Sequence, residues 1–171
     1  MILYAKWDIN SYTVHFNSNG GSQVADKTAT YNSAITVPTT NRTGYTLVGW
    51  YKDAEGKVAW NFAKDRVTAN TTICAKWVAI PAKPSNAKLT KSGKDAVKLT
   101  WSKVSGATGY EIVKSTSKTG TFSHLSSVTT TDYTNKGLSK GKTYYYKIRS
   151  YKMVGSQKIY GEWTSVMSIK L

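Results

Sequence analysis

A five-residue segment of this chain recurs 70 positions further on, and this spacing limits the folds that are open to it. The segment Leu3–Trp7, with the sequence LYAKW, returns as ICAKW at Ile73–Trp77. A repeat of this length indicates small domains in tandem rather than a solenoid of short units. We therefore predict a complete module at residues 8–78. Residues 1–7 would be the last strand of a truncated preceding repeat, packed on the next repeat or on a neighbouring molecule.

Alternating apolar and polar residues predict strands throughout this module. The expected strands cover residues 12–16, 27–31, 45–51 and 72–77, and Asn19-Gly20 supplies a turn between the first two. Residues 38–44 interrupt the alternation, and we expect one short helical turn there. No segment sustains a 3.6-residue apolar period, so the predicted fold class is mainly β.

Two prolines mark the boundary to a second module. Pro81 and Pro84 lie in residues 79–84, which we interpret as a Pro-rich linker. Such a linker favours an extended chain of about 3.1 Å per residue, or roughly 20 Å in total. It would hold the modules end to end with limited hinge freedom.

The remaining residues, 85–171, predict a second domain made only of strands. Val97, Leu99 and Trp101 alternate on one expected strand, and Tyr144–Tyr151 form a long one. Turn signals containing glycine separate such runs at regular intervals. Several short strands with this spacing indicate a β-sandwich.

The positive charge of the chain is concentrated in this second domain. The net charge is +15, and residues 79–171 hold 16 Lys and Arg against 4 Asp and Glu, a net of +12. A basic module attracts polyanions, such as sulfated glycans, teichoic acids or nucleic acid, although net charge identifies no specific partner. The sequence has one cysteine, Cys74, which excludes an intrachain disulfide and a zinc cluster of CxxC type. It contains no signal peptide and no transmembrane run of 18 apolar residues.

Residues 12–77 carry about a dozen spaced positions that resemble a known bacterial repeat. They include Asn19-Gly20-Gly21, Gly44-Tyr45, Gly49-Trp50-Tyr51, Phe62 and Ala75-Lys76-Trp77. This pattern is similar to the internalin-type B-repeat, also called the Listeria–Bacteroides repeat. The resemblance implies a small β-grasp-like module found in tandem on bacterial surface proteins, and it implies no enzyme.

Residues 84–171 resemble a fibronectin type III domain. The resemblance rests on Pro84, Trp101, Gly109–Ile112, and Leu138 followed by Tyr144. The last pair matches a tyrosine corner, in which a Tyr hydroxyl bonds back to the chain. Together the two resemblances imply an extracellular protein of a bacterial cell surface or cell wall.

A search for catalytic and metal-binding patterns finds no motif. We expect His15 and His124 to be exposed, the latter in a Ser-rich loop, and Asp53 with Glu55 to serve a turn rather than calcium. A carboxylate pair for glycoside hydrolysis would have to combine Glu111 with Asp132 or Glu162, and the spacing does not favour it. We predict no enzyme activity, no metal and no cofactor.

Cys74 and the tryptophans each allow two interpretations. Cys74 is either a small semi-buried hydrophobic residue in place of a tyrosine or a thiol activated by Lys76. Trp7, Trp77, Trp50 and Trp101 are expected in cores. Trp60 and Trp163 are assigned to neither core nor surface, and an exposed Trp could stack on sugar rings.

The outer face of the expected long strand is the candidate binding surface. Aromatic and cationic side chains alternate there, which suits a sulfated glycan or another linear polyanion. Single-stranded nucleic acid would use the same chemistry, but no specific nucleic acid is predicted. The alternative is an ordinary solvated sheet face. The candidate residues are Tyr145, Lys147, Arg149, Tyr151, Lys152 and Lys158.

Three functions remain open from the sequence. The first is a non-catalytic surface module for adhesion or ligand binding, with an anionic polysaccharide (host glycan or wall polymer), a surface protein or neighbouring repeats as partners. The second is an accessory region of an extracellular polysaccharide-degrading enzyme. The third is a spacer without a ligand.

Overall fold

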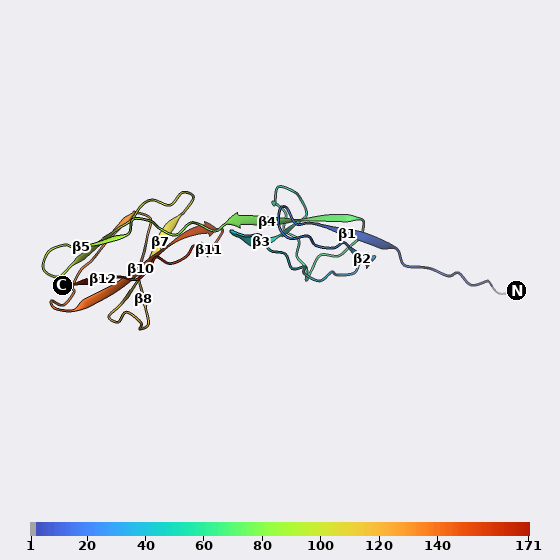
Figure 1. Cartoon of the computed structure of the whole chain (residues 1–171). Coiled ribbons are helices and arrows are strands. Elements are labelled where there is room, and N and C mark those ends of the chain that lie inside the picture. The colour runs from blue at the N-terminus through green and yellow to red at the C-terminus, as the bar shows by residue number, and fades with distance from the viewer. Residues whose placement is uncertain (1–2) are drawn as a thin grey trace. The chain divides into compact units, whose positions relative to one another are not determined.

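The computed structural model of the protein describes residues 3–171 and divides them into two compact units, 3–79 and 80–171. Both units are built from strands, as Figure 1 shows, and no helix occurs within the described residues. The predicted mainly β fold class is therefore confirmed. None of the described segments is a helix of the length and apolarity that a membrane span requires.

The first unit is a mixed sheet of four strands in the order β2-β1-β4-β3. The strands are β1 (Ser11–Asn17), β2 (Lys27–Thr30), β3 (Tyr45–Tyr51) and β4 (Thr71–Ala79). β1 and β4 pair in parallel at the centre, and the two outer pairings are antiparallel. β4 is the last strand of the unit in sequence but lies between β1 and β3 in the sheet. The sheet is therefore complete only when β4 has paired with both.

One face of this sheet carries the core of the first unit. Val14, Phe16, Ile73 and Ala75 alternate inward from the two central strands and are buried. Trp60 and Val67, from the irregular segment after β3, complete the same core. The alternation seen in the sequence thus predicts the inward face, since successive side chains of a strand point to opposite sides.

Two expectations for the first unit fail. Residues 38–44 hold no helical turn; the segment instead ends in a tight turn, where the Tyr45 N–H donates to the Arg42 carbonyl at 3.0 Å and Gly44 has the left-handed φ of +78°, which a right-handed helix does not contain. Residues 3–10 form no strand, and Leu3 and Trp7 are 81% and 89% exposed, so this segment does not pack on the repeat. Figure 1 shows it as an extended trace leading into β1. Residues 1 and 2 of the expected terminal strand lie outside the described range.

The second unit is a sandwich of two sheets. The smaller sheet has the order β5-β6-β9, and the larger has the order β11-β10-β7-β8 with β12 also paired to β10. The larger sheet contains β7 (Gly109–Ser115), β8 (Ser123–Val128), β10 (Thr143–Val154), β11 (Gln157–Tyr160) and β12 (Met167–Lys170). The smaller contains β5 (Lys88–Lys91), β6 (Val97–Thr100) and β9 (Asp132–Asn135).

The sandwich core joins both sheets. Leu99 from β6 and Ile112, Tyr146 and Ile148 from the larger sheet are fully buried. The expected tyrosine corner is present, because the Ser139 N–H donates to the Tyr144 hydroxyl at 2.9 Å.

The segment Met153–Gly161 contains one of the glycine-containing turn signals, at Val154-Gly155. β10 continues to Val154 and β11 begins at Gln157, so this segment is a tight hairpin around Gly155, whose φ is +58°. Glycine adopts that conformation without a steric penalty, which explains the short connection.

Residues of the proline-rich segment pack on the second unit. Pro81 and Pro84 are buried, and the Ser150 hydroxyl donates to the Ala82 carbonyl at 2.5 Å. The Pro81 carbonyl passes over Gly161, where an added Cβ would lie 2.2 Å from it. The second half of this segment is therefore part of the sandwich.

Candidate functional site

The candidate surface residues do not all share one exposed face of β10. Tyr145, Lys147 and Arg149 are partly exposed on the outer side of the sheet. Tyr151 also points outward but is only 8% exposed. Lys152 alternates onto the opposite side of β10, as period-two geometry requires. Lys158 comes from β11, the neighbouring strand.

Arg149 is the most strongly engaged of these side chains. Its guanidinium contacts one oxygen of Glu111 through Nη2 at 2.5 Å and Nε at 2.6 Å. Its Cζ also lies 3.5 Å from the ring centroid of Tyr160 and 4.3 Å from that of Trp163. The Arg149 and Glu111 side chains are 24% and 13% exposed, so water screens this pair only weakly. Arg149 is therefore held by three partners of its own domain.

The two lysines of the face are also placed against aromatic rings. Lys147 Nζ lies 4.2 Å from the ring centroid of Phe122 and 5.5 Å from that of Trp163. Lys158 Nζ lies 4.4 Å from the Tyr151 ring centroid. Cations at such distances are attracted by the negative face of the ring. We call the stack of Phe122, Lys147, Trp163, Arg149 and Tyr160 the cation–aromatic ladder.

The ladder depends on a break between β11 and β12. Residues 161–166 form no regular strand. Among them, only Gly161 and Thr164 form backbone hydrogen bonds to β10. Thr164 is bound twice, since its N–H donates to the Ile148 carbonyl at 2.8 Å and its hydroxyl accepts the Ile148 N–H at 3.0 Å. This anchor places Trp163 between the two cations.

The cations of this face therefore contact groups of their own domain, unlike those of a strand whose cations point only into solvent. Arg149 has its charge opposed by Glu111, and Lys147 is wedged between two rings. The sequence shows the alternation on β10, but Phe122 and Trp163 lie in irregular segments whose positions alternation does not predict. The contribution of Trp163 to this face was missed for that reason.

The histidines and carboxylates form no catalytic or metal-binding group. His15 is exposed as expected and pairs with Asp26, with 2.7 Å between Nδ1 and Oδ1. His124 is exposed too, but it lies in strand β8 rather than in a loop. Within residues 3–171 no cluster of three or more His, Cys, Asp or Glu side chains is arranged to hold a metal ion. The glycosidase candidate Glu111 is bound by Arg149 instead.

Asp53 serves its turn, as the sequence indicates. Its carboxylate accepts the Val58 N–H at 2.7 Å and the Lys57 N–H at 3.0 Å. These backbone hydrogen bonds, with that of Lys57 first, lower the pKa of Asp53. Glu55 pairs with Lys57 at 2.5 Å, so neither carboxylate points at a shared site.

Cys74 is a buried thiol. It is 7% exposed, and burial, together with the charge of Asp53, raises its pKa. Lys76 does not activate it, because the Lys76 ammonium donates to the Gly56 carbonyl at 2.8 Å. The geometry agrees with a small hydrophobic residue and contradicts an activated thiolate.

The tryptophans divide between the cores and the surface. Trp50, Trp60 and Trp101 are buried, and Trp77 is partly buried with its indole N–H donating to the Ser18 carbonyl at 2.8 Å. Trp7 is exposed, so its expected core position is wrong. The repeat-derived expectation failed because Trp7 lacks the sheet that surrounds Trp77.

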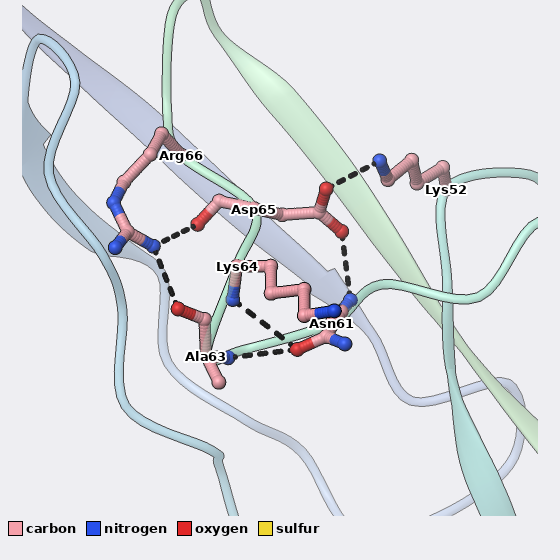
Figure 2. A network of polar contacts seen from close by, with 6 residues as sticks. All are labelled: Lys52, Asn61, Ala63, Lys64, Asp65 and Arg66. Carbon is pink, nitrogen blue, oxygen red and sulfur yellow. Dashed lines mark hydrogen bonds and ion pairs between the residues drawn. The ribbon is translucent and has the colours of Figure 1, made fainter.

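A polar network fixes the irregular segment that closes the first unit. Figure 2 shows Asp65 between the Lys52 ammonium, at 2.8 Å, and the Asn61 N–H, at 2.7 Å. The Arg66 guanidinium donates to the carbonyls of Ala63 and Asp65, both at 3.0 Å. These contacts hold the loop that carries Trp60 and Val67 into the core.

Two family models match the chain in succession. The Listeria–Bacteroides repeat model matches residues 12–76, and the fibronectin type III model matches residues 82–166. Both are module types that are generally non-catalytic.

Curated relatives share a segment of about 78 residues with this chain. A putative Gly-rich membrane protein of Evansella cellulosilytica is 51% identical over 45% of this chain and 9% of its own length. A putative membrane protein of the same organism is 47% identical over 45% of this chain and 12% of its own. Internalin H of Listeria monocytogenes is 36% identical over 44% of this chain and 14% of its own. The chain thus spans only a small part of these relatives.

Solved structures resemble one part of the chain. An Fn3-like protein from Clostridium thermocellum is 25% identical, covering 50% of this chain and 90% of that one, with a TM-score of 0.42. The sixth fibronectin type III domain of a human protein is 18% identical, covering 54% and 87%, with a TM-score of 0.46. The two family models thus match successive parts of the chain, a Listeria–Bacteroides repeat at residues 12–76 and a fibronectin type III domain at residues 82–166.

Proposed function

We propose that this chain is a non-catalytic segment of a bacterial cell-surface protein, in which the fibronectin type III domain contacts an anionic polysaccharide. The repeat would act as a spacer or as a contact for neighbouring repeats. The observation that carries the proposal is the unbalanced positive charge of the second domain.

Few of these charges are neutralised within the domain. Residues 79–171 contain 16 Lys and Arg, but only Lys98 and Arg149 form ion pairs there, with Asp132 and Glu111. The remaining cations lie mostly in solvent. Such a surface raises the local concentration of a polyanion and speeds its association.

The extracellular setting is supported by the relatives rather than by a targeting signal. The names of two relatives describe membrane proteins, and the third is an internalin. A surface location would bring the basic domain close to anionic wall polymers and to glycans of other cells. Either kind of polymer offers the repeated negative charge that a basic module attracts.

Binding of the intact chain to polymers across a salt series tests this proposal. The probes are heparin, a glycerol phosphate polymer and neutral dextran of similar length, with the affinity measured from about 0.05 to 0.3 M salt. We expect binding to at least one anionic polymer at about 0.15 M salt, where the screening length is about 8 Å, and none to dextran.

Loss of all binding well below 0.15 M salt would overturn the proposal. The positive charge would then be diffuse attraction only, and the spacer function would lead. Equal binding to dextran would also count against it, because the recognition would not depend on charge.

A further inference from the structure

We propose that the anionic polymer is held in a lysine-lined cleft at one end of the fibronectin type III domain, away from the ladder face. This inference rests on the proposed function and assigns it a site. The cleft has a volume of about 350 Å³, and its walls carry Lys91, Lys94 and Lys140 together with Gly93 and Leu171.

The cleft lies between two turns that the fold fixes relative to each other. Lys91 ends β5 and Lys94 lies in the turn to β6, whereas Lys140 lies in the turn that precedes β10. The Leu138 N–H donates to the Asp95 carbonyl at 2.8 Å and ties the two turns together. The Gly141 N–H donates to the Leu171 carbonyl at 2.8 Å and closes the other side. The three lysines are therefore brought together by the backbone rather than by a bound partner.

These lysines differ from the cations of the ladder. Lys91, Lys94 and Lys140 are exposed, and none forms an ion pair or a cation–aromatic contact within residues 3–171. Asp95 is the neighbour of Lys94 in sequence, yet it is not among the residues that line the cleft. Three like charges are thus held near one hollow whose walls include Leu171 but no Asp or Glu side chain. The mutual repulsion of these lysines is relieved when an anion binds among them.

A second hollow extends the basic region along the same turn. It is about 540 Å³ in volume and is lined by Lys142 with Thr116, Ser139, Thr143 and Tyr144. Ser139 and Lys142 lie within two residues of Lys140 in sequence, so residues of the same turn line both hollows. Hydroxyl groups beside an ammonium provide both the charge and the hydrogen bonds that an oxyanion accepts.

The chemistry of the cleft favours tetrahedral oxyanions on a linear polymer. Lysine acts as a point charge with three donors and does not impose the planar, bidentate geometry of arginine. Sulfate esters and phosphate diesters match such a site equally well. The occupant is therefore a sulfate- or phosphate-bearing polysaccharide, with one charged group in the cleft and the next toward Lys142.

Two triple variants of the intact chain with the same charge test this assignment. In the site variant, Lys91, Lys94 and Lys140 become Gln. In the control variant, Lys88, Lys103 and Lys118 become Gln; these lysines are exposed in the same domain and lie outside both hollows. Binding to heparin and to the glycerol phosphate polymer is measured at about 0.15 M salt, and the circular dichroism of both variants confirms folding.

We expect the site variant to lose about tenfold in affinity and the control variant less than about threefold, because only the site variant removes the three cations that line the cleft. A loss on either polymer supports the site and identifies the source of the oxyanion. Equal losses in the two variants would overturn the site while leaving the proposed function intact. Absence of binding by the unmodified chain would instead remove the proposed function itself.

Discussion

At the residue scale, Arg149 shows how a side chain that suits ligand binding can have a structural role. Its charge is opposed by Glu111, and its flat guanidinium lies between the rings of Tyr160 and Trp163. Arginine fits this position because a planar cation both pairs with a carboxylate and stacks on aromatic faces. Removing it would leave Glu111 only 13% exposed and without its cation.

We therefore predict that Arg149→Met destabilises the fibronectin type III domain by about 2–3 kcal/mol, mainly through the unpaired Glu111 carboxylate. Calorimetry of the intact chain measures the change. The exposed Lys103 provides the control, and Lys103→Met should stay within about 0.5 kcal/mol. An Arg149→Met protein with unchanged stability and weaker polymer binding would contradict this role and restore the ladder as the binding surface.

Gly161 provides a second prediction at the residue scale. A Cβ at this position would lie 2.2 Å from the Pro81 carbonyl oxygen and 2.8 Å from the Ser150 hydroxyl. Gly161→Ala should cost about 1–3 kcal/mol, because backbone must move to relieve the overlap. Gly49→Ala is the matched control, since its Cβ would meet only ordinary contacts from 3.5 Å outward. Thermal unfolding of the two variants compares them, and equal stability would mean that Pro81 does not pack there.

Some residue positions follow from the sequence and others do not. Leu99, Ile112 and Ile148 could be assigned to the core because alternation on a strand predicts their side of the sheet. Trp163 could not, since it lies in the break between β11 and β12 and its position depends on the Thr164 anchor. The expected core position of Trp7 is wrong, because a sequence that resembles a strand does not show that neighbouring strands are present to cover it.

At the scale of elements, the segment after β3 depends on Asp65. The Lys52 side chain and then the Asn61 N–H lower the pKa of Asp65 below its ordinary value of 3.8. The unfolded chain therefore binds a proton more readily than the folded repeat does. The stabilising effect is fully present above pH 3.8 and is lost as the pH falls through the lower folded pKa.

We predict that Asp65→Asn lowers the stability of the repeat at pH 7 and weakens its dependence on pH in the acid range. Unfolding by urea at pH 7 and at about pH 3 measures both effects. Asp53, whose pKa is also lowered, retains part of the dependence in the variant. The control is Asp8→Asn, an exposed residue before β1. An unchanged difference between the two pH values would show that the network in Figure 2 is unimportant for the fold.

The bounds of the strands are the feature of the secondary structure that the sequence predicts best. The expected strand at 45–51 matches β3, and the expected strand at 72–77 lies inside β4. The segment 38–44 was not predictable in this way, because interrupted alternation shows only that a strand ends. The turn signal at Val154-Gly155 predicts the turn there, but the strand pairing on either side of it was not predicted, because β10 extends beyond the aromatic run that defined it.

At the scale of the whole molecule, the two units have distinct electrostatic characters. Residues 1–78 hold 8 Lys and Arg against 5 Asp and Glu, a net of +3, compared with +12 in residues 79–171. Polymer binding should therefore reside in the second unit and leave the repeat unchanged. The sequence predicted this division of charge, but it could not show that the ladder engages its cations while the lysine cleft leaves its own unpaired.

Amide chemical shifts of the intact chain during titration with a sulfated oligosaccharide at about 0.15 M salt test this account most directly. The predicted result is a set of saturable shifts confined to residues 91–96 and 138–143, with the amides of residues 12–76 unchanged. Shifts centred on Lys147, Arg149 and Trp163, or on the repeat, would contradict it.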